Sequence, residues 1–249
     1  MDVIVTASYG QVMHVILVPG FWLKGSSWAP IVPALTDAGH RAYPLTLPGL
    51  ESLDARRNGI GLRDHVDTVV ATIDSIDEPV ALVGHSGGGA IIHAAVDARP
   101  DRVRRAIYVD SGPLADGSIL NDEPPFAGDD LPLPDWSEFS DAELVDLDDK
   151  LRRRIRGVAV PEPRGVAFDR QELSDDRRYD VPVTIITCTF PSVALREAID
   201  SGAVFLAELA KVKDYEIVDL PTGHWPQFTK PAELAEALVA ALRRAEFGS

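Results

Sequence analysis

The chain has 249 residues, of which 45% are apolar and 25% are charged, and its formal net charge is −15. This length and apolar fraction suit a folded protein with a sizeable core. The negative charge argues against nucleic-acid binding, which needs Lys and Arg to neutralise phosphates, and it favours a neutral, partly apolar small molecule as substrate.

Short apolar runs rich in β-branched residues alternate with segments of helical period. The expected strands cover residues 14–18, 42–45, 80–83, 106–109, 183–187 and 215–220. Apolar residues at three- and four-residue spacing predict helices at 62–76 and, shortened or kinked by Pro33, at 28–35. A closing helix is expected to begin near Pro231. Because alternating strands and helices need crossover connections, we expect an α/β fold with a mostly parallel sheet flanked by helices.

The first chemical motif is G-x-S-x-G, formed by Gly84, Ser86 and Gly88 between the strand at 80–83 and an apolar helix at 88–98. In such a motif the strand turns sharply into the helix, with the serine at the apex of a strained turn and small residues around it. The motif favours Ser86 as a nucleophile and the N–H of Gly87 as a donor to an oxyanion. An ordinary Gly-rich turn is the alternative, whereas a phosphate-binding loop would need a different glycine pattern.

The alternation stops between about residues 112 and 180, where Pro and Asp are abundant, as at 122–125, and no strand is evident. Residues 141–156 have the period of a helix. A long insertion of this kind is typical of a lid, and the helical period argues against a disordered acidic linker. We therefore expect one domain over residues 1–249, with a helical lid at about 112–180. Trp136 in this insertion is a candidate pocket residue.

His224 follows the last expected strand and is a candidate general base. A neutral imidazole can accept the proton of Ser86 and return it to a leaving group. His85 lies inside the G-x-S-x-G motif, so we expect it beside Ser86 as a pocket residue. The six histidines include no H-E-x-x-H or other metal-ligand spacing, and we expect no metal and no cofactor.

These motifs resemble those of the α/β-hydrolase superfamily over nearly the whole chain. The segment from Val15 to Trp28 is similar to the first core strand and oxyanion loop of small single-domain members, namely the plant methylesterase and hydroxynitrile-lyase group and related bacterial esterases. Pro19 and Gly20 stand where that group has His-Gly. The resemblance implies an α/β-hydrolase fold, His224 as the base and the N–H of Phe21 as a second oxyanion donor.

The same resemblance raises two questions about side chains. Phe21 and Trp22 either narrow the substrate pocket or pack in the core. The triad acid usually follows the strand at 183–187, but residues 188–192 include no Asp or Glu. Haloalkane dehalogenases and certain lipases carry the acid after the preceding strand, where this chain has Asp110. We therefore predict Asp110 as the acid, with Glu197 and Asp200 as alternatives; Asp110 as a mere turn cap is the structural alternative.

Together these residues predict a serine hydrolase that cleaves a carboxylic ester, lactone or related acyl bond through an acyl-enzyme. A hydroxynitrile-lyase-type lyase, which adds a lysine near the base, and a non-catalytic small-ligand receptor are the alternative functions.

Three features bear on location. Cys188 is the only cysteine, residues 1–11 lack the pattern of a secretory signal, and no apolar run is long enough to cross a membrane. We expect a cytoplasmic protein that binds neither membranes nor nucleic acid; the sequence does not indicate an oligomeric state.

Overall fold

The computed structural model describes residues 12–120 and 128–247. Residues 1–11, on which the expected absence of a secretory signal rests, and the acidic run at 122–125 lie outside the described residues.

Six strands form a single sheet in the order β2-β1-β3-β4-β7-β8, and all of its pairings are parallel. The strands are β1 His14–Val18, β2 Arg41–Pro44, β3 Val80–His85, β4 Val103–Val109, β7 Val183–Thr187 and β8 Tyr215–Asp219. The predicted mostly parallel sheet is confirmed. Strand β4 begins three residues earlier than predicted. The charged Arg105 can lie within this buried strand because its Nη1 donates to Thr184 Oγ1 at 3.0 Å, which offsets part of the cost of burying the guanidinium.

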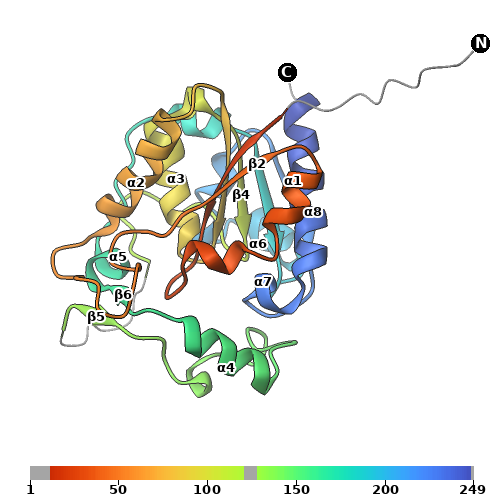
Figure 1. The fold of residues 1–249 in the computed structure, drawn as a ribbon. Coiled ribbons are helices and arrows are strands. Elements are labelled where there is room, and N and C mark those ends of the chain that lie inside the picture. The colour runs from red at the N-terminus through yellow and green to blue at the C-terminus, as the bar shows by residue number, and fades with distance from the viewer. Residues whose placement is uncertain (1–11, 121–127, 248–249) are drawn as a thin grey trace, which may run out of the picture.

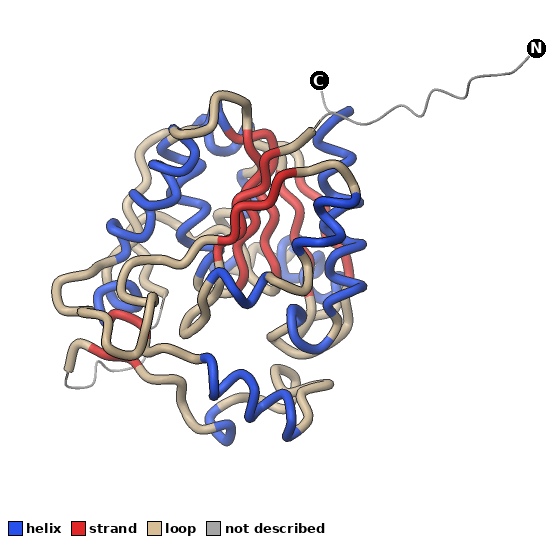
Figure 2. The backbone as a smooth tube through the Cα atoms, in the orientation of Figure 1, coloured by secondary structure: helices blue, strands red, loops and turns tan. Residues whose placement is uncertain are grey.

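Helices cover both faces of the sheet (Figure 1). The helices of the sheet layers are α1 Val32–Asp37, α2 Leu62–Asp74, α3 Gly88–Ala98, α6 Ser192–Asp200, α7 Pro226–Thr229 and α8 Pro231–Phe247. Residues of α1 and α8 pack with one face of the sheet, and residues of α2 and α3 pack with the other. Figure 2 shows the strands as one central layer between these helices.

The first helix differs from its prediction. A 3₁₀ helix, Gly25–Trp28, precedes α1, and α1 begins only at Val32. Pro33 thus lies in the first turn of α1, where its missing N–H has no intrahelical acceptor to lose. Further 3₁₀ helices are Pro100–Arg102, Trp136–Glu138, Asp176–Asp180, Val204–Leu206 and Leu209–Lys211.

The described part of the insertion, residues 112–120 and 128–180, contains the α-helices α4 Asp149–Val158 and α5 Arg164–Phe168. Its expected lack of strands is wrong, because the two-residue strands β5 Asp130–Leu131 and β6 Glu162–Pro163 pair antiparallel. The helix predicted at 141–156 is shorter at its start, since the Asp148 side chain accepts the N–H of Leu151 at 2.8 Å and caps α4. In Figure 1, α4, α5, β5 and β6 lie to one side of the sheet layers.

In the part of the chain that the structure describes, no helix has both the length and the apolar character required of a membrane span.

Candidate active site

Three strand ends bring together the side chains predicted to be catalytic. Ser86 follows β3, Asp110 follows β4, and His224 lies in the loop after β8. In an open parallel sheet the loops at the carboxyl ends of the strands share one edge, and polar groups carried there meet.

Ser86 stands on a strained turn between β3 and α3, with φ at 51°. A Cβ on Gly84 would lie 2.5 Å from the carbonyl oxygen of Gly88, and a Cβ on Gly88 would lie 2.6 Å from that of Pro19. Only glycine therefore fits at either position, as the motif requires. The hydroxyl of Ser111 donates to the Ser86 carbonyl at 2.7 Å and holds the turn from the β4 side.

The imidazole of His224 lies between a hydroxyl and a carboxylate. Its Nε2 is 2.8 Å from Ser86 Oγ, and its Nδ1 is 2.6 Å from Asp110 Oδ2. Because Nδ1 faces a carboxylate, it carries the ring proton and donates it, which leaves the Nε2 lone pair for the serine hydroxyl. This is the geometry of a nucleophile, a base and a group that orients the base.

The Asp110 side chain is only 5% exposed, yet it is held in its charged form. Oδ1 accepts the N–H groups of Cys188 and Thr189, both at 2.9 Å, and the Thr189 hydroxyl at 3.0 Å. Burial by itself raises the pKa of Asp110, but the hydrogen bond and charge of His224 and these N–H groups outweigh it and lower the pKa to about 2.

The alternative acids lie elsewhere. Glu197 and Asp200 are exposed on α6, and the described residues include no hydrogen bond from either to His224. The segment after β7, where the superfamily usually has its acid, instead supplies the donors that hold Asp110. Sequence reasoning missed Thr189 because donors to a carboxylate have no distinctive pattern.

Phe21 and Gly87 line the same cavity as Ser86, and a Cβ on Gly87 would be 2.6 Å from the Phe21 ring. Among the described residues, neither backbone N–H donates to another group. A backbone N–H without an acceptor is the kind of donor that an oxyanion can use.

Residues of the insertion bind Trp22, the neighbour of Phe21 in the loop after β1. The φ angle of Trp22 is 64°. The Trp22 N–H donates to Glu162 Oε2 at 3.1 Å, and its indole N–H donates to the Leu131 carbonyl at 3.0 Å. The Trp22 carbonyl accepts the N–H of Val160 at 2.9 Å. A strained residue persists only when its surroundings fix it, and here three hydrogen bonds do so.

Glu162 was missed in the sequence because its role depends on how the insertion folds. It is 1% exposed, and burial raises its pKa to about 8 although the Trp22 N–H and Arg57 oppose the shift. His65 Nδ1 lies 3.7 Å from Glu162 Oε1. Since His65 Nε2 is 2.8 Å from the Pro48 carbonyl, Nε2 carries the proton, and burial lowers the His65 pKa to about 4. Both shifts favour the neutral forms of Glu162 and His65.

Two of the three predicted pocket residues do not line the cavity around Ser86. His85 is 1% exposed, and its Nε2 donates to the His224 carbonyl at 2.6 Å, so it supports the backbone of the base. Trp136 packs against Phe139 and Trp225, with ring centroids 5.6 and 5.4 Å apart. Trp22 does line the cavity.

Two cavities meet at these residues. The serine cavity, of about 490 Å³, contains Ser86, Gly87 and Phe21 in its wall. The histidine cavity, of about 570 Å³, contains His224 and is bounded by the loops after β4 and β7 and by residues 205–209. Three residues belong to both walls, Asp110, Ser111 and Glu143, so the cavities adjoin at the triad.

In residues 12–120 and 128–247, no three His, Cys, Asp or Glu side chains are grouped to hold a metal ion. The lysines nearest the base in sequence contact other groups. Lys230 donates to the Pro221 carbonyl at 2.8 Å, Lys213 pairs with Asp180, and Lys211 donates to Glu208 at 3.1 Å. None of the three lines either cavity.

Comparison with known proteins places this geometry in a family. A profile of the alpha/beta hydrolase family matches residues 15–237. A carbendazim hydrolyzing esterase from Nocardioides is 27% identical over 245 residues, which cover 90% of this chain and 98% of the esterase. A pyrethroid hydrolase from Sphingobium wenxiniae is 27% identical over 91% of this chain and 86% of its own length.

Solved structures have the same fold. An extracellular alpha/beta-hydrolase from a Paenibacillus species, described as sharing structural and functional homology with tobacco salicylic acid binding protein 2, has a TM-score of 0.74 at 20% identity and covers 92% of this chain and 98% of its own. A methylesterase from Arabidopsis has a TM-score of 0.72 at 20% identity, over 93% and 99% of the two chains. The profile match spans most of the sequence, and the relatives are named as esterases and hydrolases: the chain belongs to the alpha/beta hydrolase family.

Proposed function

We propose that this chain is a serine hydrolase that cleaves a carboxylic ester, lactone or related acyl bond. The observation that carries the proposal is the relay in which His224 lies 2.8 Å from Ser86 Oγ and 2.6 Å from Asp110 Oδ2. Both distances are within the reach of proton transfer and orientation in a Ser-His-acid triad.

In the first half of the reaction, His224 Nε2 accepts the proton of Ser86 as Oγ attacks the substrate carbonyl. The N–H groups of Phe21 and Gly87 stabilise the negative charge that develops on the carbonyl oxygen. Each such donor is worth about 3 kcal/mol of barrier. His224 then gives its proton to the leaving oxygen, and the acyl group stays on Ser86.

In the second half, His224 Nε2 accepts a proton from the water that attacks the acyl carbon. It then gives this proton to Ser86 Oγ as the bond between Oγ and the acyl carbon breaks and the acid is released. The charged Asp110 stabilises the imidazolium that forms in each half. The hydrogen bond from buried His85 to the His224 carbonyl keeps the base in place through both steps.

Charge around the cavity supports a neutral substrate. Glu138 and Glu143 line the serine cavity, and the chain carries a net charge of −15. An anionic acyl group would be repelled by these carboxylates, whereas an uncharged ester or lactone would not.

The proposal is tested by labelling with a fluorophosphonate probe together with turnover of p-nitrophenyl esters. We expect one labelled serine, Ser86, and loss of both labelling and turnover in Ser86→Ala with a nearly unchanged thermal melt. Folded wild-type protein that neither labels nor turns over esters would favour a small-ligand receptor. Cleavage of a cyanohydrin without ester turnover would favour the lyase.

For location we propose the cytoplasm. The single cysteine, Cys188, is buried, so the fold does not depend on a disulfide or on an oxidising compartment. Cell fractionation tests this proposal, and recovery of the protein from the culture medium, as the description of the Paenibacillus relative suggests for that protein, would contradict it.

A further inference from the structure

The position of the histidine cavity relative to the proton on His224 Nε2 indicates which part of the substrate it receives. After attack by Ser86, His224 Nε2 must give its proton to the oxygen that leaves, so the leaving group lies against the imidazole. The carbonyl oxygen points instead to the N–H groups of Phe21 and Gly87. The cavity whose wall contains His224 but not Ser86, Phe21 or Gly87 is therefore on the leaving-group side.

The hydroxyl groups of this cavity are already committed. Ser111 donates to the Ser86 carbonyl, Ser140 to Glu143, Thr187 to the Phe190 carbonyl and Thr189 to Asp110. Each hydroxyl has one proton to donate. A polar leaving group would thus find no hydroxyl donor in the wall, whereas an apolar leaving group needs none.

Apart from these hydroxyl residues and Asp110, Glu143 and His224, the wall is apolar, and part of it is exposed. Leu206 and Leu209 form a buried part of it, at 8% and 1% exposure. Phe190 and Phe205, which also line the cavity, are 59% and 70% exposed. Large aromatic side chains left open beside a cavity are a feature of ligand-binding surfaces. A volume of about 570 Å³ lies within the usual range of small-molecule pockets.

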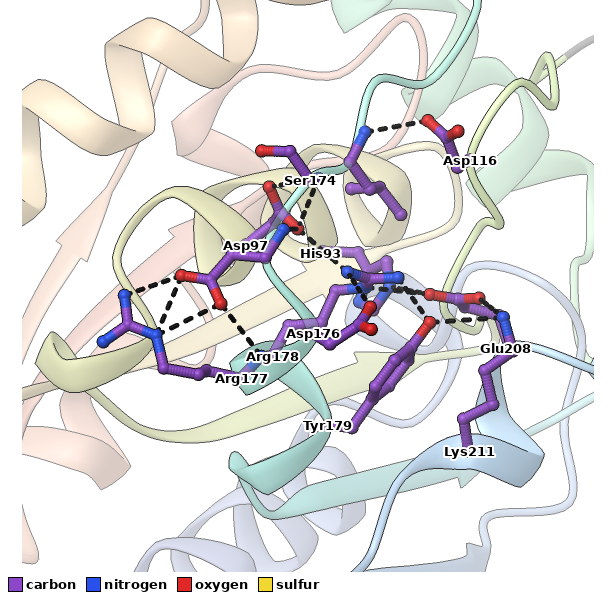
Figure 3. A network of polar contacts seen from close by, with 12 residues as sticks. His93, Asp97, Asp116, Ser174, Asp176, Arg177, Arg178, Tyr179, Glu208 and Lys211 are labelled. Carbon is purple, nitrogen blue, oxygen red and sulfur yellow. Dashed lines mark hydrogen bonds and ion pairs between the residues drawn. The ribbon is translucent and has the colours of Figure 1, made fainter.

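A buried ionic network holds this wall in place (Figure 3). Glu208 stands between Leu206 and Leu209 and is 2% exposed. Its Oε1 accepts from His93 Nε2 at 3.1 Å and from Arg178 Nε at 3.0 Å, which ties residues 206–209 to α3, the helix that follows Ser86. A wall fixed in this way is preformed for a ligand, which reduces the ordering cost of binding.

We propose that the histidine cavity receives the leaving alcohol, and that the preferred substrates are esters of a large, uncharged, apolar alcohol such as an aryl or arylmethyl alcohol. This inference rests on the proposed function. In the step concerned, the bond between the acyl carbon and the alcohol oxygen breaks, Ser86 Oγ keeps the acyl group, and the alcohol leaves with the proton of His224 Nε2. The alcohol departs into the cavity, and water later releases the acid.

The first test uses two ester series. One varies the alcohol of an acetate ester from ethanol to benzyl alcohol to 2-naphthylmethanol, and the other varies the acid of an ethyl ester over the same sizes. We expect kcat/KM to rise at least tenfold along the alcohol series. In Phe205→Ala and Phe190→Ala this rise should shrink about tenfold, while the acid series should be unchanged.

Val204→Ala is the matched control, because Val204 is 88% exposed next to Phe205 and does not line the cavity. It should leave both series as in the wild type. Hydrolysis of ethyl esters without any preference along the alcohol series would overturn the inference and leave the proposed function intact.

The second test measures binding without turnover. Quenching of 2-naphthylmethanol fluorescence by Ser86→Ala protein should report saturable binding, and the double variant Ser86→Ala, Phe205→Ala should bind about tenfold more weakly. Absence of binding, or binding that Phe205→Ala does not change, would overturn the subsite. Binding by a protein whose wild type cleaves no ester would refute both the leaving-group role and the proposed function.

Discussion

Two buried carboxyl groups hold different parts of the site, Asp110 at the imidazole of His224 and Glu162 at the backbone of Trp22, and their pKa values shift in opposite directions. Asp110 accepts hydrogen bonds from two backbone N–H groups, a hydroxyl and an imidazole, and its pKa falls to about 2. Glu162 accepts one backbone N–H and is otherwise enclosed, and its pKa rises to about 8. The number of donors, rather than burial, decides which carboxyl group is charged.

Arg57 is the cation nearest to Glu162, but it does not reverse the rise in the pKa of Glu162 because its guanidinium donates to other acceptors. Arg57 donates to the carbonyl groups of Ser52 and Pro161, at 2.7 and 2.8 Å, and to Asp130. His65, the other titratable neighbour, is neutral. In the proposed mechanism Asp110 supports the imidazolium of His224, while Glu162, whose raised pKa favours its neutral form, accepts the Trp22 N–H.

The largest expected effect comes from removing the charge of Asp110. Asp110→Asn should lower the turnover of p-nitrophenyl esters about 10⁴-fold, because the imidazole loses the partner that sets its tautomer and supports its charge. Steady-state kinetics measures this loss. Glu197→Gln and Asp200→Asn serve as controls and should keep full turnover. A silent Asp110→Asn with an inactive Glu197→Gln would reassign the acid.

The two groups should also differ in how they link stability to pH. Between about pH 4.5 and 8, Glu162 holds a proton in the folded state that the unfolded state has lost. Its contribution to stability is therefore fully present below pH 4.5. Between pH 4.5 and 8 this contribution is lost, and the unfolding equilibrium constant rises about tenfold per pH unit. Denaturant unfolding at pH 5 and pH 8 should show a smaller loss for Glu162→Gln than for the wild type. Equal losses would mean that Glu162 is ionised throughout.

For Asp110 the sign is reversed. Its pKa is lowered from 3.8 to about 2, so its contribution is present above pH 3.8 and is lost as the pH falls toward 2. Unfolding measured from pH 5 down to pH 2 should be less pH-dependent in Asp110→Asn than in the wild type. A steeper dependence in the variant would contradict the assignment of a charged Asp110.

A smaller effect is expected at the oxyanion loop. Glu162→Ala removes the acceptor of the Trp22 N–H and should lower kcat about tenfold with little change in KM, since an oxyanion donor acts mainly in the transition state. Glu162→Gln keeps an acceptor and should restore most of kcat. A merely structural role would lower the melting temperature and the active fraction while leaving kcat per active site, counted by fluorophosphonate titration, unchanged.

The smallest effect is expected for a single donor to Asp110. Thr189→Val removes the hydroxyl but keeps the backbone N–H and the shape of the side chain. One hydrogen bond to a charged group is worth about 1.5 to 3 kcal/mol, of which part will appear in turnover, so we expect a fall of a few-fold. A loss as large as that of Asp110→Asn would contradict this and show that the hydroxyl is as essential as the carboxylate.

The sequence predicted what the sheet determines. Ser86 was predicted from the G-x-S-x-G motif after a buried apolar strand. Asp110 was predicted from the family resemblance, together with its place after the preceding strand, because parallel strands bring their carboxyl ends to one edge. Periodicity gave the six strands to within two residues at their ends, except at the start of β4, which lies three residues earlier because Arg104 and Arg105 interrupt the apolar pattern of that strand.

The rest depends on contacts that have no local pattern. The strands β5 and β6 have two residues each, too few for a period, and Glu162 acquires its role only because they pair. His85 and Trp136 were expected in the pocket from their residue types and their places in the sequence. Instead, His85 donates a hydrogen bond to the His224 carbonyl, and Trp136 packs against the ring of Trp225.

The most direct test of the central claim is to trap the acyl-enzyme. Wild-type protein mixed with p-nitrophenyl acetate and quenched in acid should carry one acetyl group, and peptide mapping should locate it on Ser86. The acetyl group should be absent from Ser86→Ala. Acetylation of another residue during turnover, or turnover by Ser86→Ala at the wild-type rate, would contradict the account.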